Sequence, residues 1–186
     1  MRLSWLAVST VILAMAGAQG PYINSTADIT ASSGESWGRL LPGTPVQQDG
    51  EAVLIKGFIA AGSDELVFPE PEVRIPLAEL EPAGVAALQK GETTQDQYGN
   101  SWTAVTIKGT VDQAALSESS EQIWQEASEL YAANCSNCHS LHEPTEFTPN
   151  QWPNVLQTMV GYTALTPDQV NVVQRYLQFT SWQEGK

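Results

Sequence analysis

All cysteine and histidine residues of this 186-residue chain lie within eight positions. In the stretch NCSNCHSLHE they are Cys135, Cys138, His139 and His142. Thiolates and imidazoles are common ligands of metals and haem iron. One short turn must present all four side chains, so this cluster restricts the fold of the surrounding segment more than any other feature of the sequence.

Three kinds of chemistry use cysteines in such patterns. A structural zinc site usually separates two ligand pairs by a long loop, whereas Cys138 and His139 are adjacent, which disfavours zinc. A thioredoxin-like dithiol follows a strand in a βαβ unit, and a plain disulfide is a further alternative in an exported protein. Here the pair instead ends a segment with helical periodicity, which favours the third kind of chemistry.

Cys-Ser-Asn-Cys-His matches the attachment pattern of c-type haem. Two thiols three residues apart reach the two vinyl groups on one porphyrin edge, and the next residue then lies below the iron. The pattern predicts a single covalent haem c, with Cys135 and Cys138 as attachment residues and His139 as the proximal iron ligand.

The sixth iron ligand could come from His142 or from Met159. His142 is three residues from His139, a span of about 10 Å at most, which is too short to pass the porphyrin edge and turn back over the far face. Met159 is the one methionine beyond Met15. We therefore predict Met159 as the distal ligand, with a vacant sixth position as the alternative. His/Met ligation suits one-electron transfer rather than catalysis.

The first eighteen residues have the features of a secretory signal peptide. Arg2 precedes an apolar run from Leu3 to Met15, and small residues follow as far as Ala18. We predict cleavage near Ala18 and a periplasmic protein, with an uncleaved membrane anchor as the alternative, although the apolar run is short for a spanning helix.

The rest of the chain is strongly acidic. Without Arg2 it has seven basic and 21 acidic residues. This charge argues against nucleic acid as a partner and against more than peripheral contact with a membrane. It is compatible with docking to a basic patch on another protein, and equally with a role in solubility alone.

Composition divides the chain into four segments: a signal peptide (1–18), a polar flexible leader (19–35), a β region (36–115) and a helical region (116–186). The β region contains β-branched runs separated by glycine and proline. Two similar units within it end in Ile-Lys-Gly, at residues 55–57 and 107–109. They predict two hairpins that pack together as a small SH3-like barrel.

Three helix starts are indicated in the helical region, at Ser119, Thr148 and Thr166. The second helix is expected to include Met159, with a kink near Pro153. The predicted fold class is therefore α+β, with a small SH3-like β-barrel domain followed by a three-helix c-type cytochrome domain.

The stretch from Trp124 to Leu177 resembles the C-terminal module of TorC-type pentahaem cytochromes, which feed trimethylamine-N-oxide reductase. An aromatic helix, CxxCH, a Phe-Thr-Pro-Asn-Gln-Trp-Pro segment and a later methionine follow in the same order, and a small β domain precedes them. The resemblance covers roughly residues 36–180 and implies the same roles for the two cysteines, His139 and Met159.

The resemblance also implies an electron carrier rather than an enzyme. Its expected partners are a quinol-oxidising, membrane-bound multihaem cytochrome as donor and a periplasmic reductase as acceptor. Those pentahaem proteins carry a tetrahaem module and an anchor that are not found here, so we expect the terminal module as a free-standing protein. A haem-based sensor or adaptor with a displaceable sixth ligand is the alternative.

Overall fold

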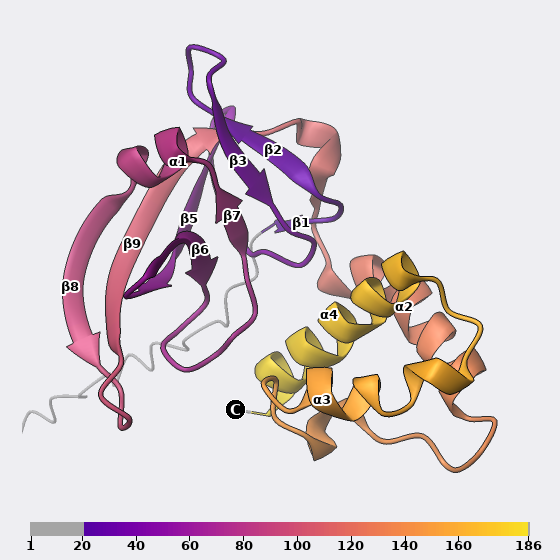
Figure 1. Ribbon diagram of the computed structural model, residues 1–186. Coiled ribbons are helices and arrows are strands. Elements are labelled where there is room, and N and C mark those ends of the chain that lie inside the picture. The colour runs from indigo at the N-terminus through magenta and orange to yellow at the C-terminus, as the bar shows by residue number, and fades with distance from the viewer. Residues whose placement is uncertain (1–20, 186) are drawn as a thin grey trace, which may run out of the picture.

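The computed structural model describes residues 21–185, in which a β-barrel precedes a helical region (Figure 1). The predicted α+β class is confirmed. The predicted signal peptide lies outside the described residues.

The barrel is closed by six antiparallel strands in the order β5-β6-β7-β3-β2-β9, and β9 pairs with β5 to complete the ring. The six strands are β2 (Ala27–Thr30), β3 (Ser36–Leu40), β5 (Ala52–Ala60), β6 (Ser63–Phe68), β7 (Ala78–Leu80) and β9 (Ser101–Thr110). Four further strands and two short helical segments complete the region: β1 (Tyr22–Ile23), β4 (Gln47–Asp49), β8 (Gln89–Gln95), β10 (Leu116–Ser117), α1 (Pro82–Ala87) and a 3-10 helix (Gln113–Ala115).

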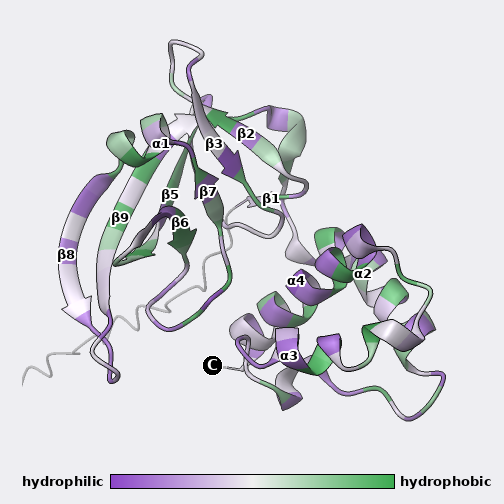
Figure 2. Cartoon of the chain, in the orientation of Figure 1, coloured by the Kyte–Doolittle hydropathy of each residue, from purple (hydrophilic) through white to green (hydrophobic). Residues whose placement is uncertain are grey.

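The core of the barrel follows from the period of two in its longest strands. Every second residue of β5 from Val53 to Ile59 is buried, and the residues that alternate with them are less so. β9 places Val105 and Ile107 inward in the same way. Successive strand side chains point to opposite faces, so one face of each strand fills the barrel. By contrast, β8 is exposed along its whole length and is hydrophilic in Figure 2.

The two predicted hairpins are present and are joined to each other. β4 pairs with β5 and β8 pairs with β9, while β5 and β9 pair along their whole length. Ile55 lies opposite Ile107 in that pairing. The two Ile-Lys-Gly units therefore face each other across the centre of the sheet, and each ends where a neighbouring strand approaches closely.

Gly57 stands at one of these close approaches. A methyl group at Gly57 would overlap the backbone carbonyl oxygen of Phe68 on β6. We expect Gly57→Ala to lower the free energy of unfolding by about 1–3 kcal/mol, because a backbone atom cannot move aside without distorting the strand pair. Gly91→Ala on the exposed strand β8 is the matched control, where the nearest atom would be 3.5 Å away. Urea denaturation checks both variants, and equal stability of the two would contradict the expectation.

The predicted flexible leader is wrong for most of residues 21–35. Ile23 and Ile29 are fully buried, and β2 lies in the barrel wall between β3 and β9. The alternation in Ala27-Asp28-Ile29-Thr30 is the strand signal that was missed, since two apolar residues at a spacing of two are too few to stand out from a polar segment.

The helical region contains three main helices: α2 (Ser120–Cys135), α3 (Trp152–Gln157) and α4 (Pro167–Glu184). Two 3-10 turns, Pro144–Glu146 and Val160–Tyr162, lie between them. α4 begins as predicted, because Thr166 and Gln169 form a reciprocal capping box with proline at the first helical position. Within residues 21–185, no helix has both the length and the apolar character needed to cross a bilayer.

The second helix is shorter than predicted at both ends. It begins at Trp152 rather than after Thr148, and Met159 lies beyond its end. Asn150 is held outside the helix, because its side chain donates to the Glu72 carbonyl (2.5 Å) and accepts from the Arg74 N–H (2.8 Å). Contact with the barrel thus competes with helix formation at this end.

An apolar cluster joins the helical region to the barrel. Ile75 and Leu77, from the segment before β7, pack with Trp124 of α2 and Phe179 of α4. Gly43 allows the contact, because a methyl group there would overlap the Trp124 ring. Figure 1 shows α4 on the side of the helical region that faces the barrel.

Candidate haem-attachment site

Helix α2 positions the two cysteines. Its N-terminus is capped by the Ser119 side chain, which accepts a hydrogen bond from the Glu121 N–H. Trp124, Ala127 and Tyr131 are buried at spacings of three and four residues, so this face of the helix is fixed against the core. The helix ends at Cys135, and the orientation of its last turn is therefore set by the packing of the earlier turns.

Polar residues within and beside the CxxC segment hold the end of α2. The last carbonyl groups of a helix have no partner inside the helix. Asn134 donates to the Leu130 carbonyl (2.9 Å), Ser136 to Ala132 (2.7 Å) and Asn137 to Ala133 (3.1 Å). These side chains were not predicted to cap the helix, although a run of short polar residues at a helix C-terminus is a recognisable capping signal.

The two cysteines differ in environment. Cys135 is half-buried among apolar side chains, and burial raises the pKa of its thiol. Cys138 is exposed on the turn that follows. No disulfide joins them. One thiol therefore lies at the edge of the apolar core and the other lies outside it.

His139 is exposed, with Nδ1 at 2.7 Å from the carbonyl oxygen of Ser140. A carbonyl oxygen can only accept, so Nδ1 carries the proton and the lone pair of the neutral ring is on Nε2. Histidines that bind metals commonly donate their other ring N–H to a carbonyl or carboxylate in this way. The hydrogen bond thus leaves Nε2 in the form needed to bind iron.

His142 is engaged in a different pair. Its Nδ1 lies 2.6 Å from Glu146 Oε2, and its backbone carbonyl accepts a hydrogen bond from the Tyr131 hydroxyl (2.9 Å). The rings of His139 and His142 are 5.3 Å apart, edge to face. The loop after the motif is therefore tied back to α2, and His142 is positioned beside His139 by partners of its own.

Tyr131 gives this loop a measurable pH dependence. Burial raises the pKa of Tyr131 to about 12, from 10.0 in an ordinary setting. The folded state therefore keeps the phenol protonated where the unfolded chain ionises. We expect the contribution of Tyr131 to the free energy of unfolding to be complete below pH 10 and to be lost as the pH rises toward 12. Chemical denaturation between pH 10 and pH 12 should show that the free energy of unfolding falls less steeply with pH in Tyr131→Phe than in the wild type. Equal dependence on pH in the two proteins would contradict the role given to Tyr131.

Met159 lies in a separate segment, between α3 and the following 3-10 turn. It is half-buried, and its backbone is held by hydrogen bonds with Leu156 (2.9 Å) and Tyr162 (3.0 Å). Neither bond joins it to His139 or the cysteines. The structure thus groups Cys135, Cys138 and His139 at the end of α2, and the assignment of Met159 as distal ligand stays a prediction.

The surroundings of the motif suit a flat apolar cofactor. The inner core of the helical region is fully enclosed and consists of Tyr131, Trp152, Leu156, Val173 and Leu177. Around it lies a shell of side chains that are only half-buried, including Leu130, Leu141, Phe147, Val155, Val160 and Leu165. Such residues retain apolar surface that a porphyrin could cover. The thiols, the free Nε2 and this shell together fit covalent haem.

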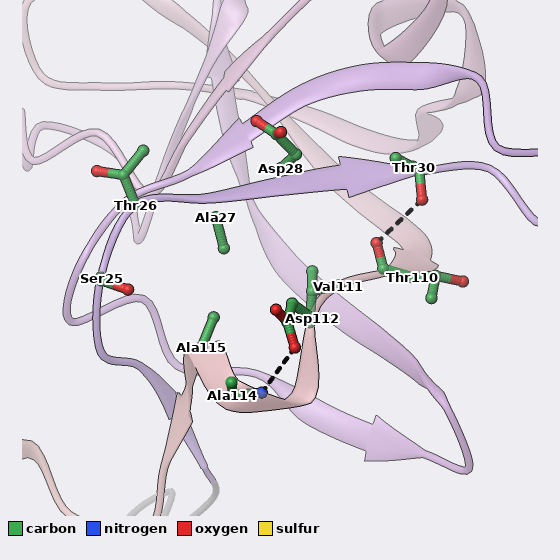
Figure 3. Close-up of a pocket in the computed structure, with 10 residues that line it drawn as sticks. All are labelled: Ser25, Thr26, Ala27, Asp28, Thr30, Thr110, Val111, Asp112, Ala114 and Ala115. Carbon is green, nitrogen blue, oxygen red and sulfur yellow. Dashed lines mark hydrogen bonds between the residues drawn. The ribbon is translucent and has the colours of Figure 1, made fainter.

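A pocket in the barrel wall has different chemistry. β2 and β9 pair only at Thr30 and Thr110, and the chain beyond them separates to leave the hollow in Figure 3. Asp112 is turned toward its own helical segment and accepts a hydrogen bond from the Ala114 N–H (2.9 Å). Its carboxylate is therefore used as a cap, and residues 21–185 contain no cluster of three or more His, Cys, Asp or Glu able to hold a metal ion.

Comparison with known proteins points to the same chemistry: the chain is a distant homologue of c-type cytochrome proteins. TorY of Escherichia coli O157:H7 is 29% identical over 130 residues, 69% of this chain and 35% of TorY. TorC of Escherichia coli strain K12 is 27% identical over 156 residues, 79% of this chain and 40% of TorC. TorY of Haemophilus influenzae is 25% identical over 146 residues.

The chain thus spans about two fifths of the length of the curated relatives it matches. No protein-family model and no solved structure matches it.

Proposed function

We propose that this chain carries one haem c, bound through Cys135 and Cys138, and transfers single electrons. His139 would be the proximal ligand of the iron and Met159 the distal one. The observation that carries the proposal is the end of α2, where two thiols and an imidazole with a free Nε2 occupy one turn. The bound haem would supply the redox centre, and the residues around it would attach it, orient it and exclude water.

The proposed pathway runs from a quinol-oxidising, membrane-bound multihaem cytochrome to a periplasmic reductase, as in trimethylamine-N-oxide respiration. Similarity to TorC and TorY supports it. The order of a β domain before one CxxCH motif supports the further proposal that this chain corresponds to the C-terminal monohaem module of such proteins. The protein would act in the periplasm after cleavage near Ala18.

The negative charge of the helical region supports the proposal that the partner proteins present basic patches. Between residues 116 and 185 the only basic residue is Arg175, which is mostly buried, whereas eight acidic residues lie in the same range. The helical region that holds the candidate site therefore presents acidic side chains to a partner. Complementary charge raises the rate of encounter between proteins and lowers it at high salt.

The test of Met159 is spectroscopic. We expect the oxidised haem-loaded protein to be low-spin, with a weak sulfur-to-iron band near the red end of the visible spectrum, and we expect Met159→Ala to lose that band and to have a lower reduction potential. Thr158→Ala is the control, since it changes the neighbouring exposed side chain and leaves the thioether. High-spin iron in the native protein would instead support a sensor or adaptor with an open sixth position.

A further inference from the structure

A second cavity, of about 670 Å³, lies between the barrel and α4. It shares no lining residue with the candidate haem site. Three of the eight basic residues of the chain line it: Arg39 and Arg74 from the barrel and Arg175 from α4. Two carboxylates, Glu79 and Asp168, also line it. In a chain of net charge −13, this wall has more positive than negative groups.

Arg175 has no carboxylate within 4 Å among residues 21–185. Its guanidinium donates to the Pro42 carbonyl through Nε (3.2 Å) and Nη2 (2.7 Å), and to the Pro76 carbonyl through Nη1 (3.0 Å). It also lies 5.2 Å from the centre of the Phe179 ring.

Three of the five N–H groups of Arg175 are accounted for in this way. Burial lowers the pKa of Arg175 to about 10, which reflects the cost of holding a charge away from water. A buried cation usually has an anionic partner. Here the hydrogen-bond acceptors are neutral carbonyl groups, and the nearby carboxylate that favours the charged form, Glu79, is already ion-paired with Arg39.

The other two arginines differ from each other. Arg39 forms an ion pair with Glu79, so its charge is balanced within the wall. The Arg74 side chain has no hydrogen bond or ion pair with the described residues, but its backbone N–H is held by Asn150. Arg74 is thus a charged group at a fixed place on the rim. Asp168 lies in the first turn of α4, where the helix dipole stabilises a carboxylate.

We propose that this cavity binds a small oxyanion, a carboxylate or a phosphate, between Arg74 of the barrel and Arg175 of α4. Guanidinium groups bind both kinds of anion through paired N–H donors. Because the two arginines come from different regions of the chain, a bound anion bridges the barrel and the helical region and stabilises the joint between them.

The test is isothermal titration calorimetry of the full-length, haem-loaded protein with sodium phosphate and, separately, sodium acetate. Sodium chloride keeps the ionic strength constant throughout. We expect saturable binding of one anion per chain, and about tenfold weaker binding in Arg74→Gln, which loses a charge-assisted contact; tenfold corresponds to about 1.4 kcal/mol. Arg74→Lys keeps the positive charge but not the planar guanidinium group, so its affinity for the anion should lie between those of the wild type and Arg74→Gln.

Lys56→Gln is the matched control, because it removes one positive charge at an exposed position of strand β5 that does not line the cavity. It should bind the anion as the wild type does. Absence of saturable binding of either anion to the wild type would overturn the proposal, and so would an equal loss of affinity in Arg74→Gln and Lys56→Gln. Binding in a protein that fails the spectroscopic test of Met159 would leave this proposal standing, since the two sites share no residue.

Discussion

Replacing Cys135 and Cys138 with serine should leave the protein without covalently attached haem. Each thioether link needs a sulfur atom, and these are the only cysteines of the chain. In a host that attaches c-type haem, the double variant should show no Soret absorbance after denaturing electrophoresis, and haem staining of its band should be absent. The effect is expected to be complete rather than partial.

Ser140→Ala is the control for this experiment. It lies beside the motif, and the group that fixes His139 is the backbone carbonyl of residue 140, which alanine retains. This variant should hold one haem per chain. Haem that stays attached to the double cysteine variant after denaturation would contradict the attachment site, and with it the proposed function.

Replacing Trp152 with alanine should lower the free energy of unfolding by about 3–5 kcal/mol. Trp152 is fully buried, and its Nε1 donates a hydrogen bond to the Pro144 carbonyl (2.8 Å). Its ring packs edge to face against the rings of Phe147 and Tyr131, with centroid distances of 5.0 Å and 6.3 Å. The substitution therefore leaves a large cavity and one carbonyl without its partner. Urea denaturation followed by circular dichroism measures the change.

Tyr98→Ala provides the matched control for the tryptophan variant. Tyr98 is another large aromatic residue, but 77% of its surface is exposed. Its removal should change the stability by no more than about 0.5 kcal/mol. If the two variants were equally stable, the core of the helical region would not be organised around Trp152.

Aromatic side chains connect the candidate site to the joint with the barrel. Tyr131 contacts the loop that carries His142. Tyr176 of α4 packs against the cluster that contains Tyr131 and also against the cluster of Trp124 at the barrel. Tyr176 thus links the end of α2 to the barrel, which supports a role for the barrel in orienting the site.

The features that could be predicted from the sequence depend on residues close together in the chain. The CxxCH pattern is such a feature, as are the capping box of Thr166 and Gln169 and the two Ile-Lys-Gly hairpins. Each is specified within a few residues, because hydrogen bonds at helix ends and turns join near neighbours. Their partners are therefore visible in the sequence itself.

Other features were decided only by the tertiary structure. Residues 22–30 were predicted as part of a flexible leader, but β1 pairs with β10 and β2 pairs with β9, both far away in sequence, as well as with the adjacent strand β3. The late start of α3 has the same origin, since Asn150 bonds to residues 72 and 74 of the barrel.

The arginine-lined cavity is the clearest example. Arg39, Arg74 and Arg175 are separated by 35 and 101 residues, and no local pattern relates them. Burial of the apolar cluster around Trp124 and Phe179 brings α4 against the barrel and places the three on one wall. Sequence alone determined which side chains the CxxCH segment can offer to a cofactor, because its residues are close together in the chain. Packing of distant apolar residues determined which charges meet at the joint.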